Sequence, residues 1–122
     1  LLAVDRDNPW VSKLFESYHP GVLVALEYIA RVAREAGKPC GVCGDMAGDP
    51  ATAVMLMGFG FDSISAAAHF APEIKHAVRS VTMEDAQALA KDLAEQATVA
   101  AVRERLGEFA ARFGLTGDAL RV

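Results

Sequence analysis

The apolar residues of this chain recur mainly at the three- and four-residue spacing of helices. One such stripe follows His19-Pro20 and ends at Gly37, which predicts a helix between them. We expect the apolar stripe to face the core; it consists of Val22, Leu23, Leu26, Ile29 and Ala33. Further helices are predicted over residues 11–16, 51–57, 72–79, 82–96 and 98–113.

Two short apolar runs lack this helical spacing and predict β-strands. They cover residues 39–43 and 61–66, and both read as strands buried in a parallel sheet. Strands that alternate with helices pair in parallel, and the helices cover both faces of the sheet. The predicted fold class is therefore α/β, rich in helices, with two buried parallel strands.

The length of the chain limits this fold. Its 122 residues, 52% of them hydrophobic, suffice for one ordinary core. A closed eight-stranded βα barrel needs about 250 residues, and this chain supplies about a quarter of the strands. The sequence also begins with Leu1, inside an apparent strand or its exit loop. We therefore expect residues 1–122 to be one part of a larger domain, with no complete second domain.

The charge and composition of the chain argue against two classes of partner. It has 12 basic and 16 acidic side chains, whereas nucleic-acid binding normally requires a clustered basic excess. No apolar run reaches the roughly 18 residues that span a bilayer. Two cysteines do not make a disulfide framework, which favours a reducing compartment. We expect no nucleic-acid or membrane partner and a cytoplasmic location.

The loop after the first predicted strand is the strongest candidate for chemistry. Cys43 ends that strand, Gly44 follows it, and Asp49-Pro50 begins the next helix. Enzymes of the α/β class place functional groups in loops at the carboxyl ends of strands, so a thiol here fits a catalytic acid or nucleophile. The alternative is that Cys43 is a small buried residue.

Cys40 and Cys43 also form a Cys-x-x-Cys pair, which is found in redox couples and zinc sites. Zinc needs about four ligands, and His19, His69 and His76 have no recognisable spacing. Side chains three residues apart in a strand point to opposite faces. We therefore expect the two thiols to diverge and Cys40 to be a small buried residue.

Arg6 is a second candidate for the site. It stands at the exit of the apolar run that opens the chain. Its planar guanidinium would suit a phosphate or a carboxylate at that position. The alternative is an arginine that only faces solvent.

Several segments, taken in order, carry a family resemblance. They are Ala3-Val4-Asp5-Arg6-Asp7-Asn8, His19-Pro20, Gly41-Val42-Cys43-Gly44-Asp45-Met46-Ala47-Gly48-Asp49, Gly58-Phe59-Gly60-Phe61-Asp62-Ser63-Ile64-Ser65 and Ile74-Lys75. Together they resemble the C-terminal end of phosphoenolpyruvate-protein phosphotransferase, which is enzyme I of the bacterial sugar phosphotransferase system, and its nitrogen-related paralogue. The resemblance covers essentially the whole chain. The first residues and Phe113-Gly114-Leu115 favour the nitrogen branch.

This resemblance implies a fold and a reaction. The fold would be the phosphoenolpyruvate-binding (βα)8 TIM barrel, of which this chain would be the C-terminal fragment, carrying the last two strands and their helices. The family moves phosphate from phosphoenolpyruvate to a histidine on another domain and then to an HPr-like phosphocarrier protein, and it releases pyruvate. It uses Mg²⁺ and works as a homodimer.

The resemblance also implies roles for individual residues. Cys43 matches the catalytic cysteine that protonates the methylene carbon of the enolate, a step that suits a thiol because it stays protonated near neutrality yet can release its proton. Arg6 matches an arginine that contacts the substrate phosphate. Gly44 would keep space for the substrate beside the thiol. Position 45 is usually glutamate in this motif and is Asp45 here.

The resemblance leaves other parts of the reaction outside this sequence. The ligands of Mg²⁺ are expected upstream of Leu1, as is the histidine nucleophile, so we expect no metal ligand here and a fragment inactive alone. One alternative is a non-catalytic dimerisation or interaction module, because an incomplete barrel exposes strand edges. The other is a fragment of a pyruvate phosphate dikinase or phosphoenolpyruvate synthase relative, which shares only the core of the cysteine motif.

Overall fold

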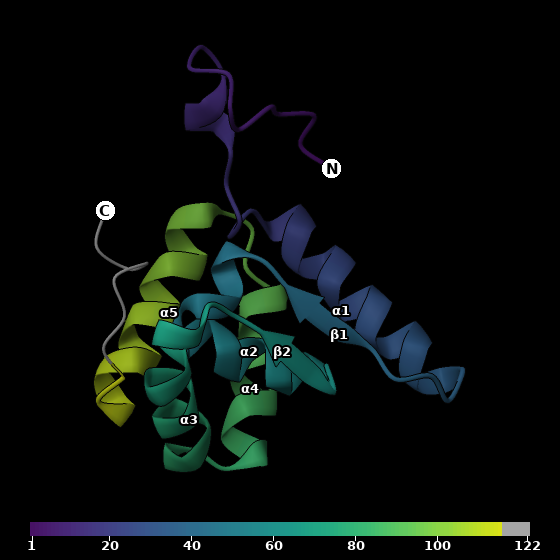
Figure 1. Cartoon of the computed structure of the whole chain (residues 1–122), viewed down its shortest axis with the longest axis vertical. Helices are drawn as coiled ribbons and strands as arrows, with labels where there is room; N and C mark the ends of the chain where they lie inside the picture. The colour runs from purple at the N-terminus through teal and green to yellow at the C-terminus, as the bar shows by residue number, and fades with distance from the viewer. Residues whose placement is uncertain (116–122) are drawn as a thin grey trace.

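The computed structural model describes residues 1–115 as a helix-rich α/β arrangement (Figure 1). In order along the chain, the α-helices and strands are α1 (Pro20–Glu35), β1 (Gly41–Cys43), α2 (Pro50–Phe59), β2 (Ser63–Ser65), α3 (Ala71–Ser80), α4 (Met83–Ala94) and α5 (Val99–Phe113). Short 3-10 turns cover Ser12–Leu14, Asp45–Gly48 and Ala68–Phe70. The alternation of helices and strands that the sequence predicts is therefore confirmed.

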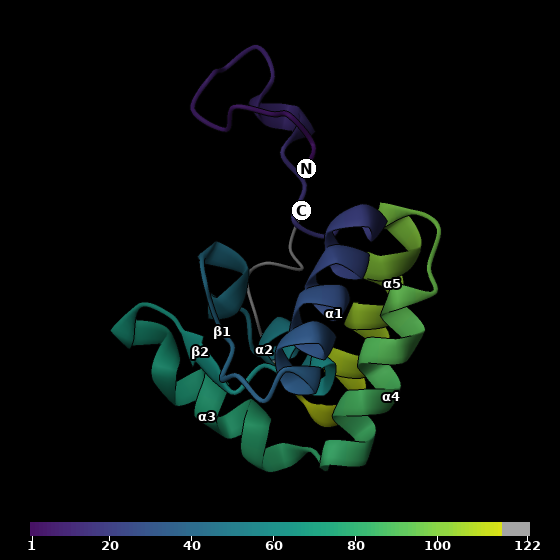
Figure 2. The same ribbon diagram turned by 90° about the vertical axis from the view of Figure 1, so that its right-hand side faces the viewer.

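Helix α2 is the centre of the core. Eight of its ten residues are buried, and Figure 2 shows it between the strands and the pair α4 and α5. It packs most closely on α4, where Gly58 faces the backbone of the other helix. A Cβ atom on Gly58 would overlap the carbonyl group of Ala86, so this close approach requires glycine.

Most predicted helix ends are confirmed, because local hydrogen bonds determine them. His19 Nδ1 accepts from the Gly21 N–H at 3.1 Å and caps α1. Thr82 and Asp85 form both bonds of the capping box that begins α4. Gly114 ends α5 in the left-handed conformation that favours glycine. The predicted helix at 11–16 is shorter and is a 3-10 turn over Ser12–Leu14.

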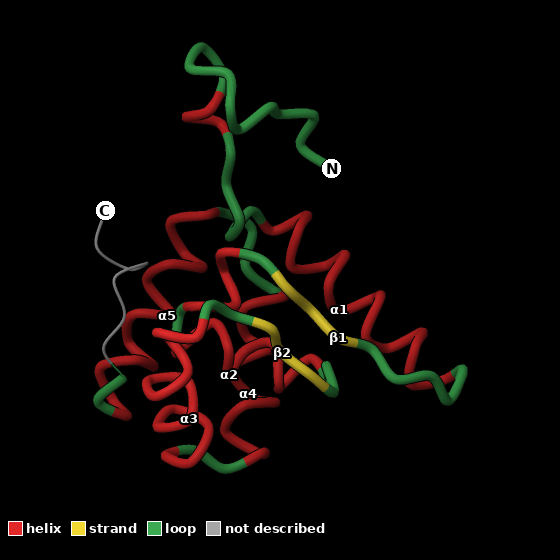
Figure 3. Tube along the Cα trace, in the orientation of Figure 1, coloured by secondary structure: helices red, strands yellow, loops and turns green. Residues whose placement is uncertain are grey.

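The two strands pair in parallel, as predicted, with Val42 opposite Ile64. They are shorter than the predicted 39–43 and 61–66 (Figure 3). The prediction that both strands are buried is wrong: in each, only the central residue is half-buried and its two neighbours are exposed. Alternate side chains of a strand point to opposite faces, and the described helices cover one face of this ribbon. Because residues 1–115 contribute two strands, they do not themselves close a barrel.

The prediction for the apolar stripe of α1 is wrong in one position. Leu23 and Ala30 are buried, but the side chain of Ile29 is 49% exposed. Ile29 follows Leu23 by six residues, which at 3.6 residues per turn places it about 120° away around the helix. Helix α1 packs on α2 and α4 with the Leu23 side, so the side that carries Ile29 faces solvent.

The N-terminal segment, residues 1–17, extends away from the helical body (Figure 1). None of its residues is buried, and Trp10 is 85% exposed. It returns to the body at Tyr18, which is 4% exposed and belongs to the core. Within residues 1–115, no helix has both the length and the apolar composition needed to cross a membrane.

Candidate functional site

Cys43 is the last residue of β1 and stands at the edge of an exposed loop. It is exposed and not in a disulfide. Gly44 follows with φ 128° and ψ 176°, a backbone conformation that side chains strongly disfavour. A Cβ atom at Gly44 would meet no atom of residues 1–115 within 4 Å, so among these residues the backbone angle is what requires glycine. The turn Asp45–Gly48 then leads into α2.

The two cysteines occupy different environments, and only Cys43 belongs to β1. Cys40 is half-buried and packs against the core, whereas Cys43 is exposed. The backbone of Cys40 is bonded to Asp62 in both directions: its N–H donates to Asp62 Oδ2, and its carbonyl accepts from the Asp62 N–H, both at 2.8 Å. Cys40 therefore has a structural position, and Cys43 has an accessible one.

Arg6 lies beside the loop of residues 44–49 that follows Cys43, called the Cys43 loop below. Its Nη1 is 3.3 Å from Asp45 Oδ2, although the two residues are 39 positions apart. Both side chains are well exposed, 62% for Arg6 and 85% for Asp45. Exposed ion pairs contribute at most about 1 kcal/mol, so this pair orients the arginine without holding the segment firmly. The structure thus places Arg6 against the loop that follows Cys43, through Asp45.

The inner half of the same loop is tightly packed. Ala47 and Gly48 are buried, and a Cβ on Gly48 would lie 2.8 Å from the ring of Phe70. Asp49 follows at 4% exposure and caps α2. Its Oδ1 accepts from the Thr52 N–H and from the Thr52 hydroxyl, each at 2.8 Å. The loop is therefore exposed to solvent at Cys43, and at Asp49 it is buried and held by hydrogen bonds.

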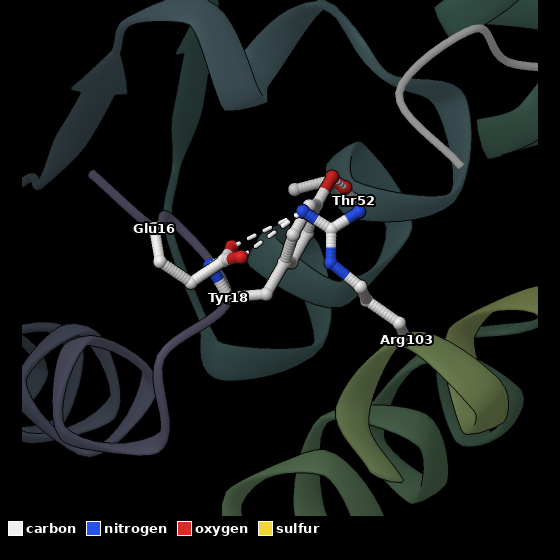
Figure 4. A network of polar contacts seen from close by, with 4 residues as sticks. All are labelled: Glu16, Tyr18, Thr52 and Arg103. Atoms are coloured by element: carbon white, nitrogen blue, oxygen red, sulfur yellow. Dashed lines mark hydrogen bonds and ion pairs between the residues drawn. The ribbon is translucent and has the colours of Figure 1, made fainter. Parts of the chain in front are cut away.

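The capping group continues into a polar network that is buried at Tyr18 and Thr52 and half-buried at Glu16 and Arg103 (Figure 4). The Tyr18 hydroxyl lies 2.9 Å from Thr52 Oγ1. The guanidinium of Arg103 lies over the Tyr18 ring, 5.0 Å from its centroid, and its Nη2 donates to Glu16 Oε2 at 3.1 Å. Burial raises the pKa of Tyr18 above 10.0, and the hydrogen bond with Thr52 only partly opposes this effect.

A groove of about 500 Å³ lies beside the loop, between the N-terminal segment and Met46. Its other lining residues are Leu1, Leu2, Ala3, Val4, Asp5, Phe15, Glu16, Ser17 and Val22. The charged side chains among these are both acidic, so the groove itself would not attract an anionic substrate. An anion near Cys43 would instead depend on Arg6.

No metal-binding cluster forms within residues 1–115, because no three His, Cys, Asp or Glu side chains gather there. His19 caps α1, and His69 and His76 are exposed on and beside α3.

The chain also matches a model of a known protein family. The model of the phosphoenolpyruvate-binding domain of PEP-utilising enzymes matches residues 1–83. The chain belongs to this family. The matched residues include the N-terminal segment, the Cys43 loop, both strands and α1 to α3, so they contain Arg6, Cys43 and Gly44.

Individual proteins similar to this chain agree with the family model. The chain is 37% identical over 117 residues to the "phosphoenolpyruvate-dependent phosphotransferase system" protein of Salmonella typhimurium, covering 96% of this chain and 16% of that protein. It is 36% identical over 108 residues to the phosphoenolpyruvate-protein phosphotransferase of Haemophilus influenzae, covering 88% and 19%. A Haloferax volcanii phosphotransferase of the same name is 38% identical over 108 residues, with coverage of 87% and 19%. The resemblance in the sequence is confirmed, and the chain spans less than a fifth of these relatives.

Sequence reasoning missed the polar network beneath the loop. Asp49 with Thr52 three positions later is a recognisable capping pattern, and it could have pointed to Thr52. Tyr18 and Arg103 carry no comparable signal, because they meet Thr52 and Glu16 only through the packing of α1, α2 and α5.

Proposed function

We propose that this chain is the C-terminal part of the PEP-binding (βα)8 barrel of a phosphoenolpyruvate-protein phosphotransferase. In this proposal β1 and β2 are the last two barrel strands, and residues 1–122 belong to that one domain. The longer enzyme, called the parent enzyme below, transfers phosphate from phosphoenolpyruvate to a histidine and then to an HPr-like phosphocarrier, and it releases pyruvate. The main support is one observation: Arg6 and the exposed Cys43 loop lie together in a chain of this family.

Cys43 is the proposed proton donor. When the histidine attacks phosphorus, the bond between phosphorus and the enol oxygen breaks and the enolate of pyruvate leaves. The Cys43 S–H then gives its proton to the methylene carbon, which becomes the methyl group of pyruvate, and solvent restores the thiol. The exposure of Cys43 at the end of β1 supports this role, because the thiol is open to a substrate.

Arg6 and Gly44 are the proposed substrate-binding residues. The guanidinium of Arg6 would bind the phosphate of phosphoenolpyruvate through its planar fork. Asp45 would hold that guanidinium toward the loop until the substrate arrives, which gives a use to the shorter carboxylate at this position. Gly44 would leave the space above its backbone for the substrate, and no atom of the described residues lies within 4 Å of its Cβ position, which supports this role.

The ligands of magnesium would lie upstream of Leu1 in the parent enzyme. When bound, it would offset charge on the phosphoryl and enolate oxygens. Nothing that Cys43 or Arg6 does in this proposal requires a metal ligand from residues 1–115.

The test is Cys43→Ala in the parent enzyme. General acid catalysis contributes about 10²- to 10⁴-fold, so pyruvate formation should fall by at least about 100-fold while the circular dichroism spectrum is unchanged. Cys40→Ala is the matched control, since this half-buried thiol is outside the proposed chemistry, and it should retain near-normal activity. Near-normal activity of Cys43→Ala would remove the residue from its role.

A second experiment concerns the chain by itself. Incubated with labelled phosphoenolpyruvate, Mg²⁺ and a phosphocarrier, the 122-residue chain should not form pyruvate, because no histidine nucleophile or metal site is expected in it. Turnover by the isolated chain would contradict the proposal that it is one part of the enzyme.

A second candidate function is an interaction module, and one observation favours it. The outward side of α1 exposes large apolar side chains, namely Val24, Tyr28, Ile29 and Val32. Contiguous exposed apolar surface of this kind is typical of an interface. A homodimer formed through this domain would cover it. A clean monomer in light scattering, for the chain and for the parent enzyme, would argue against this function.

A further inference from the structure

In the polar network under the Cys43 loop, the donor and the acceptor of each hydrogen bond can be assigned. The Thr52 hydroxyl has one proton, and it donates this proton to Asp49 Oδ1 at 2.8 Å. In the 2.9 Å contact between Tyr18 and Thr52, the Tyr18 hydroxyl is therefore the donor. The bonds run from Tyr18 through Thr52 to the carboxylate at the end of the loop, and the phenol proton is needed to complete them.

These groups are almost completely buried. Tyr18 and Asp49 are each 4% exposed and Thr52 is 0% exposed. Asp49 Oδ2 has no hydrogen-bond partner among the described residues, so the carboxylate depends on its other oxygen. Buried polar groups that lose a partner are costly. The position of the Asp49 carboxylate therefore depends on the Thr52 hydroxyl that donates to it and on the Tyr18 hydroxyl that donates to Thr52.

Tyr18 is itself held from two sides. Glu16 Oε1 accepts from the Tyr18 backbone N–H at 2.8 Å, and Glu16 also receives the Arg103 guanidinium that covers the Tyr18 ring. Figure 4 shows this arrangement, with Arg103 reaching from α5 across the ring to Glu16. The ring position is thus fixed by a residue of α5.

Tyr18 also lies between the two sides of the candidate site. The segment that carries Arg6 returns to the body at Tyr18, and the loop that carries Cys43 enters α2 at Asp49. The phenol bond to Thr52 is the buried polar link between that segment and the start of α2.

We propose that Tyr18 is a positioning residue for the proton-donating Cys43 loop, acting through the hydroxyl of Thr52 and the carboxylate of Asp49. This inference rests on the proposed function for its effect on catalysis. Tyr18 does not touch the substrate in this scheme. Its hydroxyl keeps Asp49 aligned, and the turn between Asp49 and Gly44 then keeps the thiol in place.

The first test is steady-state kinetics of Tyr18→Phe in the parent enzyme. Only the hydroxyl is removed, so kcat for pyruvate release should fall about tenfold, which corresponds to a modest misplacement of a reacting group, while KM for phosphoenolpyruvate changes less than about twofold. Ser80→Ala is the matched control, because it also removes one hydroxyl, but an exposed one at the end of α3, and it should leave both constants unchanged. A rise in KM without a fall in kcat would overturn the proposal.

Thr52 provides an independent pair of variants. Thr52→Ser keeps the hydroxyl and should retain kcat, whereas Thr52→Val removes it and should lower kcat as Tyr18→Phe does. The double variant Tyr18→Phe/Thr52→Val should be no slower than Thr52→Val alone, because both changes break one chain of bonds. Independent, multiplicative losses would overturn the proposal. If Tyr18→Phe does not fold, the comparison of Ser and Val at position 52 still decides it.

Amide hydrogen exchange measures the loop without any catalysis. Ala47 N–H donates to Gly44 at 3.0 Å and Asp49 N–H donates to Met46 at 3.3 Å, so these two amides report the turn. In Tyr18→Phe they should exchange at least about tenfold faster, while the Ala86 amide in α4 is unchanged. Unchanged exchange in the loop overturns the proposal, even if the enzyme is active. If the unmodified enzyme forms no pyruvate, the proposed function is wrong. The amide exchange rates of Ala47 and Asp49 then decide whether Tyr18 positions the loop.

Discussion

Helix α2 and the N-terminal segment differ sharply in burial, although both lead to the same candidate site. Eight of the ten residues of α2 are buried, whereas none of residues 1–17 is. The Cys43 loop ends where α2 begins, and Arg6 reaches this loop from the exposed segment. The difference teaches that the described chain keeps its stability in the helical body and its candidate chemistry at an exposed edge. Changes in the two regions should therefore affect different properties.

The largest effect on stability is expected in the body. Leu56 is fully buried in α2, so Leu56→Ala should lower the free energy of unfolding by about 2–5 kcal/mol, through lost contacts and a cavity. Leu14→Ala is the matched change in the exposed segment, where Leu14 is 57% exposed, and it should cost less than about 0.5 kcal/mol. Denaturant unfolding measures both. Equal losses would contradict the division between the two regions.

A smaller loss is expected from Gly58→Ala. Alanine normally stabilises a helix interior relative to glycine by about 0.5–1 kcal/mol. Here the new Cβ would overlap the carbonyl of Ala86, so we expect a net loss of about 1–3 kcal/mol instead. Gly107→Ala in α5 is the control, because no atom of residues 1–115 lies within 4 Å of its Cβ position, and it should be stabilising. Thermal unfolding of the two variants should thus give shifts of opposite sign.

A pH-dependent effect is expected at the start of α4. The hydrogen bond from the Thr82 hydroxyl, and then the one from its backbone N–H, holds the pKa of Asp85 below 3.8. A depressed carboxyl pKa contributes stability above the unfolded value, and this contribution is lost as the pH falls through the folded value. Asp85→Asn should therefore lower Tm at pH 7, and its difference from the unmodified chain should shrink below about pH 3.8. A difference that is constant with pH would assign the effect to another cause.

The smallest effect on stability is expected at the exposed edge. Arg6 and Asp45 pair at 3.3 Å, and both side chains are mostly exposed to solvent. In a double-mutant cycle of Arg6→Ala and Asp45→Ala, the coupling should be less than about 1 kcal/mol, and it should weaken as salt is added. In the parent enzyme the same Arg6→Ala should raise KM for phosphoenolpyruvate, which reports its proposed phosphate contact. A coupling of several kcal/mol would mean that the Arg6–Asp45 pair contributes substantially to the stability of the fold.

Much of the local structure followed from the sequence because neighbouring residues determine it. Asp49 and Thr82 cap their helices with hydrogen bonds that reach three positions along the chain. Gly114 ends α5 because it accepts a left-handed backbone. The same local chemistry placed Cys43 at the end of a strand and separated it from Cys40.

The burial of apolar side chains, in contrast, could not be predicted from the local sequence pattern. Apolar residues around Cys43 and at Ile29 look like core in the sequence, but one face of the strands and one side of α1 face solvent. An apolar side chain is buried only if another element covers it, and the sequence pattern does not say whether the described chain supplies that element.

The sequence by itself determined the order of helices and strands, the family, and the loop that carries Cys43, because periodicity, capping residues and motifs are local properties. Tertiary structure alone decided that Arg6 meets Asp45 across 39 positions and that Arg103 of α5 fixes Tyr18 through Glu16. Such contacts depend on how the helices pack on one another. They cannot be inferred from a spacing along the chain, since partners this distant leave no pattern in either segment.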